Sequence, residues 1–534
     1  MNNLTLAQGH PATVQHLASA YTTIKTTELG ITHVILVIFA ISFTNFINML
    51  WKKRNFLLFA KSAKCYPVPQ AANRFPMPWS LNRKYEVYKG VLRGNLFDNH
   101  FRRMHEKYSN THAIVSAFTG QQKGINTIEP ENFKSVLGTN FDDYKRSKYR
   151  LLAAAPMMPP GILTLDGHEW SHWRSLIRTQ FTRKNFDANI ADSERHMQLT
   201  FKAFGPVNAD GWTGEVNLMD HVYRLSMDTV TQFLFGHSAE TQSAKLIRLG
   251  LLPAPSSAQP FDLDNFAETF AVAAYYVGHR IKLSNMYFLL DSLAYRRACR
   301  SLRRMTSAYI SSTLSRSNPK GTTPTSADAD NAGTSVITSL FASGATLEDI
   351  TTQVTHLLVA GMDTSSATLG WIFAVLAEHP EKYAKLRGEV VSVFGTEESR
   401  LAEFDLERLK TWLDGREPVA VRKGARVQLG VYLAHRRKDI WGEDAEEFRP
   451  ERWEGRRRGW DFTPFSGGPQ ICIGQGYSVA QLSFAIARIV MRYDRIEKVE
   501  GANNLKQGWQ SVLTPAEGVR LRMHLAEGSK PLEV

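Results

Sequence analysis

Cysteine is scarce in this 534-residue chain, which carries only Cys65, Cys299 and Cys472. An odd and sparse set does not form the disulfide framework of a small secreted protein, and it fits a working part that faces a reducing compartment. The paired spacing of zinc-binding cysteines is absent as well. Because a lone cysteine is usually a small buried apolar residue, a functional role for any of the three requires support from its context.

Other signatures are also missing from the sequence. It has no internal repeat, no glycine fingerprint of a nicotinamide-binding fold after a strand, and no compact basic run interleaved with aromatics. The net charge of +13 fits an anionic membrane surface, an acidic partner or a solvated surface rich in Lys and Arg. We therefore expect no nucleic-acid partner. The composition, 43% hydrophobic and 22% charged, is that of a globular protein able to bury a large core.

One apolar run is long enough to cross a membrane. Residues 31–50 carry no formal charge with His33 taken as neutral, and about 20 such residues span a bilayer core. Lys52, Lys53 and Arg54 follow at once, which places that flank in the cytosol. We predict a lumenal segment 1–30, a transmembrane anchor 31–50 and a body on the cytosolic side of the endoplasmic reticulum membrane. A cleaved signal peptide and a buried core helix are the alternatives.

The remaining organisation follows from proline and polar patterning. Residues 51–80 are basic and then rich in proline, which predicts a hinge before a body at 81–534. The polar stretch 316–335 predicts a long surface loop. The longest helical signal covers residues 346–379, with a capping-box pattern at Thr346 and Asp349 and a stop at Pro380. Asn3 begins a glycosylation sequon on the predicted lumenal side, a triplet that is common by chance.

The strongest chemical signal lies near the C-terminus, in the string PFSGGPQICIGQG at residues 464–476. Phe465, Gly468, Cys472 and Gly474 are spaced as in a tight loop that presents a thiolate to a metal and then opens a helix. Backbone N–H groups and the helix N-terminus would stabilise the negative sulfur. A glycine-rich turn around a buried cysteine is the alternative.

At this point the chain resembles the cytochrome P450 superfamily over nearly all of its length. The resemblance implies a mainly α fold with a small β region behind the anchor, and a haem whose iron is held by Cys472. It also implies an oxygen-binding groove on the long helix at Gly361, with Asp363 and Thr364 delivering protons. From the residues alone, a mid-helix Gly361 indicates a packing or functional need, and Thr364 can bond back to a carbonyl.

Two further segments carry the resemblance. Trp170 and Arg174 match a Trp-x-x-x-Arg segment that implies binding of a haem propionate, a pairing that suits arginine. Residues 448–453 match the segment that precedes the haem loop in the family. Gln470 departs from the pattern, because many members have Arg or His there, facing a propionate. A glutamine can donate a hydrogen bond to that group but brings no charge.

Longer strings narrow the resemblance. GILTLDGHEWSHWR and HRRKDIWGEDAEEFRPERW look like the fungal branch that hydroxylates n-alkanes and fatty acids. The implied reaction inserts one atom of O2 into a C–H bond, with electrons from an NADPH–cytochrome P450 reductase. A fatty acid, an alkane or a lipid-like polyketide would be the substrate, in an apolar pocket lined by Ile162, Val359, Val512 and Leu513. A haem-thiolate isomerase or dehydratase is the rival enzyme class.

A second departure is larger. After FDLERLKTWL the family has a helix bearing Glu-x-x-Arg and then strands of the pocket, but here Leu413 is followed directly by Asp414 and Gly415. Compared with the family pattern, a segment of several tens of residues is missing, by genuine loss or by a mis-joined exon. Without it we expect Arg449 and Arg452 to lack their acidic partner. A non-catalytic haem- or lipid-binding relic is therefore a second function to test.

Overall fold

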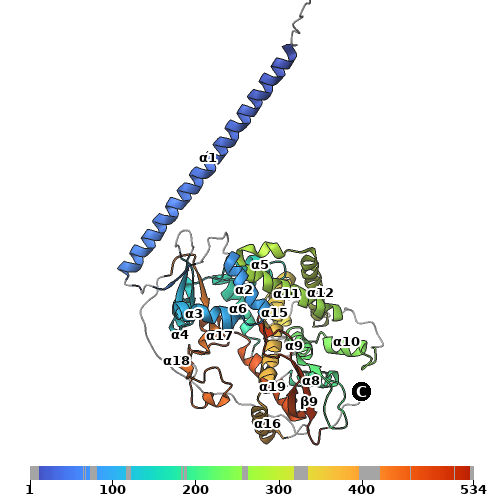
Figure 1. Cartoon of the computed structure of the whole chain (residues 1–534). Coiled ribbons are helices and arrows are strands. Elements are labelled where there is room, and N and C mark those ends of the chain that lie inside the picture. The colour runs from blue at the N-terminus through green and yellow to red at the C-terminus, as the bar shows by residue number, and fades with distance from the viewer. Residues whose placement is uncertain are drawn as a thin grey trace, which may run out of the picture. The chain divides into compact units, whose positions relative to one another are not determined.

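The structure is a computed structural model that describes most of the chain (Figure 1). The described residues are 11–63, 65, 68–72, 81–115, 122–181, 185, 189–254, 263–317, 335–395, 421–457, 459–509 and 511–529. The sequon at Asn3 and the junction between Leu413 and Asp414 lie outside them, as does most of the predicted polar loop.

Helices make up most of the described chain, as predicted, and their order can be followed by colour in Figure 1. In the N-terminal half they are α1 (Pro11–Ser62), α2 (Leu81–Arg93), α3 (Arg102–Tyr108), α4 (Pro130–Lys134), α5 (Lys148–Ala154), α6 (Gly167–Arg178), α8 (Ile190–Ala203), α9 (Leu218–Phe235) and α10 (Thr241–Arg248). In the C-terminal half they are α11 (Leu263–Leu283), α12 (Leu293–Ser317), α14 (Val336–Ala342), α15 (Leu347–Leu376), α16 (Pro380–Phe394), α17 (Val431–Ala434), α18 (Lys438–Trp441) and α19 (Gln475–Arg492).

The strands are short and form three small sheets. They are β1 (Gln70–Ala72), β2 (Thr111–Val115), β3 (Gln122–Thr127), β4 (Val216–Asn217), β5 (Arg426–Leu429), β6 (Tyr493–Lys498), β7 (Gln507–Trp509), β8 (Leu513–Pro515) and β9 (Arg520–Leu525). The sheet orders are β1-β2-β3-β5, β4-β9-β6 and the antiparallel hairpin β7-β8. This small β content confirms the predicted fold class.

The chain divides into two compact units. The first contains α1 and the sheet formed by β1, β2, β3 and β5, and the second contains the other helices and the two smaller sheets. In the second unit, one large apolar core lies among α8, α9, α11, α12, α15 and α19. All candidate functional residues that the structure describes belong to this second unit.

The predicted anchor lies within a single long helix, α1, which has 52 residues. Its segment His33–Ser62 contains an 18-residue window with a mean hydropathy of 2.0, none of which is buried, so the segment is long and apolar enough to cross a membrane. The helix also continues through residues 51–62, which we had predicted to be part of a hinge. The reason is physical, since no proline interrupts the chain until Pro67.

Helix α15 is the central helix of the second unit. Its N-cap is Thr346, and the side chains of Thr346 and Asp349 form the predicted capping box. The helix ends at Leu376, three residues before the predicted end, and Pro380 opens α16 instead. By length and composition α15 is also apolar enough to cross a membrane, but half of its most apolar window is buried inside the protein. It packs on α9, α12 and α19.

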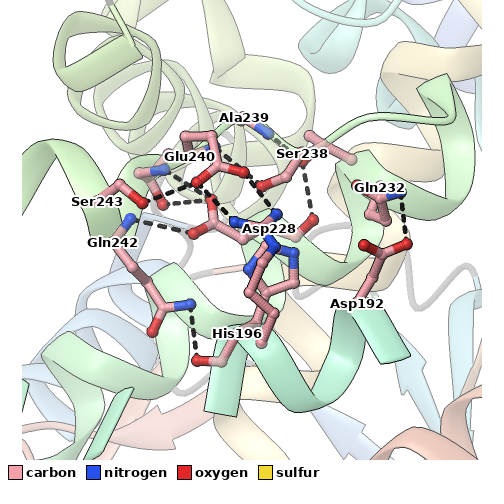
Figure 2. Close-up of polar contacts among 12 residues, drawn as sticks. Asp192, His196, Asp228, Gln232, Ser238, Ala239, Glu240, Gln242 and Ser243 are labelled. Atoms are coloured by element: carbon pink, nitrogen blue, oxygen red, sulfur yellow. Dashed lines mark hydrogen bonds and ion pairs between the residues drawn. The ribbon is translucent and has the colours of Figure 1, made fainter. Parts of the chain in front are cut away.

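A buried carboxylate ties α8, α9 and α10 together behind this core (Figure 2). Asp228 of α9 accepts hydrogen bonds from the backbone N–H of Thr241 and Gln242, at 2.7 and 3.0 Å, and from the Thr241 hydroxyl at 2.8 Å. It therefore caps the start of α10. Gln242 in turn donates to the carbonyl of His196 on α8, at 3.2 Å. Burial raises the pKa of Asp228 to about 6.

Candidate active site

The cysteine loop lies between the short 3-10 helix η7 (Gly468–Gln470) and α19. The backbone N–H of Cys472 donates to the carbonyl of Phe465 at 3.0 Å, which closes the loop. Gly468 has a φ of +63°, and a side chain there would collide with the backbone carbonyl of Leu137. Gly474 is the N-cap of α19. The four residues of the predicted motif therefore lie in one loop, and the geometry requires a glycine at position 468.

Cys472 is an exposed residue of this loop, although its thiol is partly desolvated. Burial raises the pKa of the thiol, while the backbone N–H of Gly474 and the positive charge of Arg174 act in the opposite direction. Arg174 also donates from Nη2 to the carbonyl of Ile471 at 2.7 Å, although 297 residues separate the two. Donors of this kind stabilise a thiolate more than a thiol.

Helix α6 holds Trp170 and Arg174 as the sequence predicted, one turn apart. Trp170 is buried, with 6% of its surface exposed. The guanidinium of Arg174 lies 5.3 Å from the centroid of the Trp170 ring, and that of Arg146 lies 5.9 Å from it. Two cations thus lie beside the same indole.

Arg146 and Arg150 are residues that the sequence analysis missed. Arg146 forms a salt bridge with Asp166 at 3.2 Å. Arg150 is accessible, yet burial lowers its pKa, with Asp166 acting in the opposite direction. The run KRSKYR at 145–150 was the available signal, but such a run is usually a solvated face.

The middle of α15 has exposed side chains, although the residues next to them in the sequence are buried. Thr364 and Thr368, one turn apart, are exposed, while residues 365–367 between them are buried. The Thr364 hydroxyl donates back to the carbonyl of Ala360 at 2.6 Å. In a buried helix such a face indicates open space beside it.

Asp363 and Thr364, the predicted proton-delivery pair, hydrogen-bond to other groups and not to each other. The carboxylate of Asp363 accepts a hydrogen bond from Ser511, at the turn of the β7-β8 hairpin, whereas the Thr364 hydroxyl is used within α15. Burial raises the pKa of Asp363, and the bond from Ser511 partly offsets this. Ser511 is thus a second residue that sequence spacing could not identify.

Gly361 has a packing reason for being a glycine. A Cβ at this position would lie 3.0 Å from Cγ2 of Val230 on α9, a distance that real side chains rarely reach. The glycine therefore allows α9 and α15 to approach each other closely. A role for Gly361 in holding oxygen remains a prediction.

The predicted pocket residues lie on α15 itself, which carries Val359, and on two segments that contact α15. Ile162 is buried, and its backbone N–H donates to Gln353 at 3.0 Å. Val359, Val512 and Leu513 are half-buried. The carbonyl of Leu513 accepts from the indole of Trp371 at 2.9 Å. The structure thus attaches the segment around Ile162 and the β7-β8 hairpin to the same helix.

His356 fixes the segment before α6 to α15. Its Nδ1 accepts from the backbone N–H of Leu163 at 3.1 Å, which leaves the proton on Nε2 to donate to the carbonyl of Pro159 at 2.7 Å. Burial lowers the pKa of His356 to about 4, in agreement with this neutral form. Gly161 packs directly against the ring. Sequence reasoning did not identify this clamp, because it joins positions 193 and 197 residues apart.

The expectation about unpaired arginines near residues 448–453 is wrong. Arg449 forms a salt bridge with Asp444 at 2.7 Å. Arg452 donates to the carbonyls of Trp441 and Asp444, at 3.2 and 2.7 Å. Partners from the same segment therefore satisfy both guanidinium groups. Gln470, by contrast, lies in η7 and makes no hydrogen bond with the described part of the chain.

The residues around the cysteine loop fit the haem that the resemblance implies. Cys472 offers an exposed thiol beside Gly474, where a Cβ would make ordinary van der Waals contact with the Phe181 ring at 3.4 Å and with the sulfur at 4.0 Å. Arg174 supplies a cation next to the same loop. Helix α15 supplies an accessible face within an apolar core. A thiolate, a guanidinium and an apolar wall are what such a group requires.

Residues 76–412 and 411–523 match the family Cytochrome P450. The chain is 32% identical over 441 residues to Cytochrome P450 monooxygenase g430 of Fusarium sp, with 75% of each chain covered. It is 30% identical over 506 residues to Cytochrome P450 52E1 of Candida apicola, which covers 87% of this chain and 93% of that one. It is 27% identical over 500 residues to Cytochrome P450 monooxygenase alt2 of Alternaria solani, with 85% and 90% covered.

These similarities confirm the predicted superfamily and fungal branch, the oxidoreductase class and the haem cofactor. They extend over the body of the protein and reach both the cysteine loop and the long helix. The chain therefore belongs to the cytochrome P450 family.

Proposed function

We propose that this monooxygenase binds haem through the sulfur of Cys472 and oxidises a long apolar chain. The observation that carries the assignment is the accessible sulfur beside the Gly474 N–H and Arg174. When bound, a haem with a thiolate ligand activates O2 and inserts one oxygen atom into a C–H bond. Phe465, Gly468 and Gly474 keep the loop in shape for this contact.

The propionate groups would be held by arginines rather than by residue 470. Arg174 reaches the cysteine loop, and Trp170 holds its guanidinium in place. Arg146, whose guanidinium lies 5.9 Å from the centroid of the same indole, supplies a second cation. Gln470 adds at most one neutral hydrogen bond. Guanidinium groups pair with carboxylates in a fixed two-bond geometry, which orients the bound group as well as attracting it.

Protons would reach the site through Asp363, Ser511 and Thr364. A carboxyl group whose pKa is raised by burial can hold a proton near neutral pH and release it to a neighbouring hydroxyl. Asp363 touches Ser511, and Thr364 presents its hydroxyl on the accessible face of α15. Reduction of the bound group would need an external NADPH–cytochrome P450 reductase, because the chain has no nicotinamide fingerprint.

The body would lie in the cytosol at the endoplasmic reticulum membrane, anchored by α1. The support is the apolar segment His33–Ser62 and the cations at 52–54, which the positive-inside rule places in the cytosol. A chain that lacks residues 1–62 should leave the membrane fraction. Protection of the body from protease inside sealed microsomes would show that the orientation is reversed.

A non-catalytic relic is the second candidate, because the family match is broken into two pieces that meet at residues 411–412. This break lies beside the predicted gap between Leu413 and Asp414. The decisive experiment compares the chain as written with a version that restores the missing segment. We expect a stable thiolate-type band in the reduced carbon monoxide difference spectrum, and oxidation of a fatty acid, from the restored version.

The same experiment separates the alternatives. A full thiolate-type band and turnover from the shorter chain would show that the gap is harmless. A band without turnover in either version, even with reductase present, would favour the relic. Product formation without reductase would favour an isomerase or dehydratase.

A further inference from the structure

One lysine beside the β7-β8 hairpin has no acidic partner among the residues that the structure describes. Lys282 lies in the last turn of α11 and is half-buried. Its ammonium group donates to the carbonyl of Trp509 and lies 5.0 Å from the centroid of that indole ring. Burial lowers its pKa to about 8, and no charged side chain contributes to this shift. A cation in such a position is only partly compensated.

Several charged groups on the surrounding elements are engaged elsewhere. Lys282 lowers the pKa of His279 on the same helix, although burial is the larger cause of that shift. The acids and cations on the elements packed nearby form other pairs: Arg280 and Arg296 with Asp291, Lys506 with Glu517, and Arg102, Tyr432 and Gln507 with Asp98. Lys282 therefore remains available for an anion that the described part of the chain does not supply.

The hairpin connects this lysine to the candidate active site. Trp509 pairs with Leu513 across the hairpin, and Leu513 accepts a hydrogen bond from Trp371 of α15. The turn between the strands carries Ser511, which donates to Asp363. The Trp509 ring beside the ammonium group offers an apolar surface along which an alkyl chain can lie. A cation and an apolar wall together match an acid with a long hydrocarbon tail.

We propose that Lys282 binds the carboxylate of a fatty-acid substrate and so makes the enzyme prefer acids over neutral hydrocarbons of equal length. This proposal rests on the proposed function and names its substrate class. The carboxylate would take the place of the missing acidic partner, while the tail extends along the hairpin toward α15. A charge-assisted hydrogen bond of this kind favours the acid by about tenfold or more.

The test compares binding of dodecanoic acid and 1-dodecanol to the full-length, haem-loaded chain by calorimetry. The wild type should bind the acid about tenfold more tightly than the alcohol. Lys282→Met should remove this preference and leave alcohol binding unchanged, and Lys282→Arg should restore it. Lys438→Met is the matched control, since Lys438 is exposed and paired with Glu443 at 2.8 Å.

The pH dependence supplies a second readout. The acid should bind more weakly as pH rises above about 8, where Lys282 loses its proton, whereas alcohol binding should not change. An acid-to-alcohol ratio in Lys282→Met equal to that of the wild type would overturn the proposal. Calorimetry measures binding whether or not Cys472 is the iron ligand. The absence of a thiolate-type spectrum would therefore overturn the proposed function, while the ratio of acid to alcohol affinity would still decide the role of Lys282.

Discussion

Ser511 donates a hydrogen bond to the carboxylate of Asp363, across 148 residues of sequence. This bond joins the turn of the β7-β8 hairpin to the middle of α15. Because it lowers the pKa of Asp363 against the effect of burial, it adjusts how readily this carboxyl group gives up a proton. A loop residue thus sets the acidity of a group on the central helix.

Replacing Ser511 with alanine should raise the pKa of Asp363 further, because burial then acts without opposition. Because Asp363 acts as a proton donor, the alkaline limb of the pH–rate profile should move to higher pH. An acid whose folded-state pKa is raised contributes stability at low pH that is lost as pH rises through that pKa. Thermal midpoints should therefore fall more steeply with pH in Ser511→Ala. Ser511→Thr, which keeps the hydroxyl, should behave as the wild type, and superimposable profiles for all three proteins would refute the coupling.

Thr364→Ala should bind haem normally but release reducing equivalents as hydrogen peroxide. The reason is that the hydroxyl on the accessible face of α15 is lost, and positioned proton transfer contributes roughly 10²–10⁴-fold in rate. The ratio of product to NADPH consumed, measured with reductase, reports the effect. Thr368→Ala is the matched control, because Thr368 is also exposed and also bonds back one turn, at 2.8 Å to Thr364. Equal coupling in the two variants would contradict a special role for Thr364.

Gly468→Ala should prevent the cysteine loop from closing. The added Cβ would meet the backbone carbonyl of Leu137, and the positive φ at this position strains any side chain. We expect loss of the thiolate-type band in the carbon monoxide spectrum. Gly476→Ala is the control within the same motif, since no heavy atom lies within 4 Å of a Cβ there. The loop argument fails if both variants retain the wild-type band.

Asp228→Ala should destabilise the body without altering the spectrum of bound haem. It removes the acceptor of three hydrogen bonds at the start of α10, and unsatisfied buried donors cost about 1–3 kcal/mol each. We expect a loss of about 3 kcal/mol, measured by denaturant unfolding. Asp192→Ala, which removes only the 2.9 Å bond from Gln232, should cost about 1 kcal/mol (Figure 2). Equal losses in both variants would exclude Asp228 as the principal cap.

Sequence reasoning was most successful where the determinants are local. The capping box at Thr346 and Asp349 needs only a spacing of three residues, and the motif around Cys472 fits within one loop. It was least successful for partners that meet only after folding. Nothing in the sequence near Asp363 indicates Ser511. The error at Arg449 is different, because its partner Asp444 lies in the same short segment and the expected partner was sought only in the missing helix.

The predicted hinge shows a different source of error. Its proline content was assigned to the whole of residues 51–80, although the first proline is Pro67. Residues 51–62 contain no helix breaker, so α1 continues through them. The position of a breaker, rather than the average composition of a window, determines where a helix ends.

Gly361 of α15 and Val230 of α9 lie so close together that their side chains compete for the same space between the two helices. A methyl group added at Gly361 has to be removed from Val230, so the two residues are expected to vary together among related enzymes. Gly361→Ala and Val230→Ala should each destabilise the protein, by overpacking and by a cavity respectively. The double variant should recover part of the loss, because neighbouring substitutions that exchange volume are not additive. The packing of α15 against α9 at Gly361 therefore restricts which substitutions α15 tolerates close to Asp363 and Thr364.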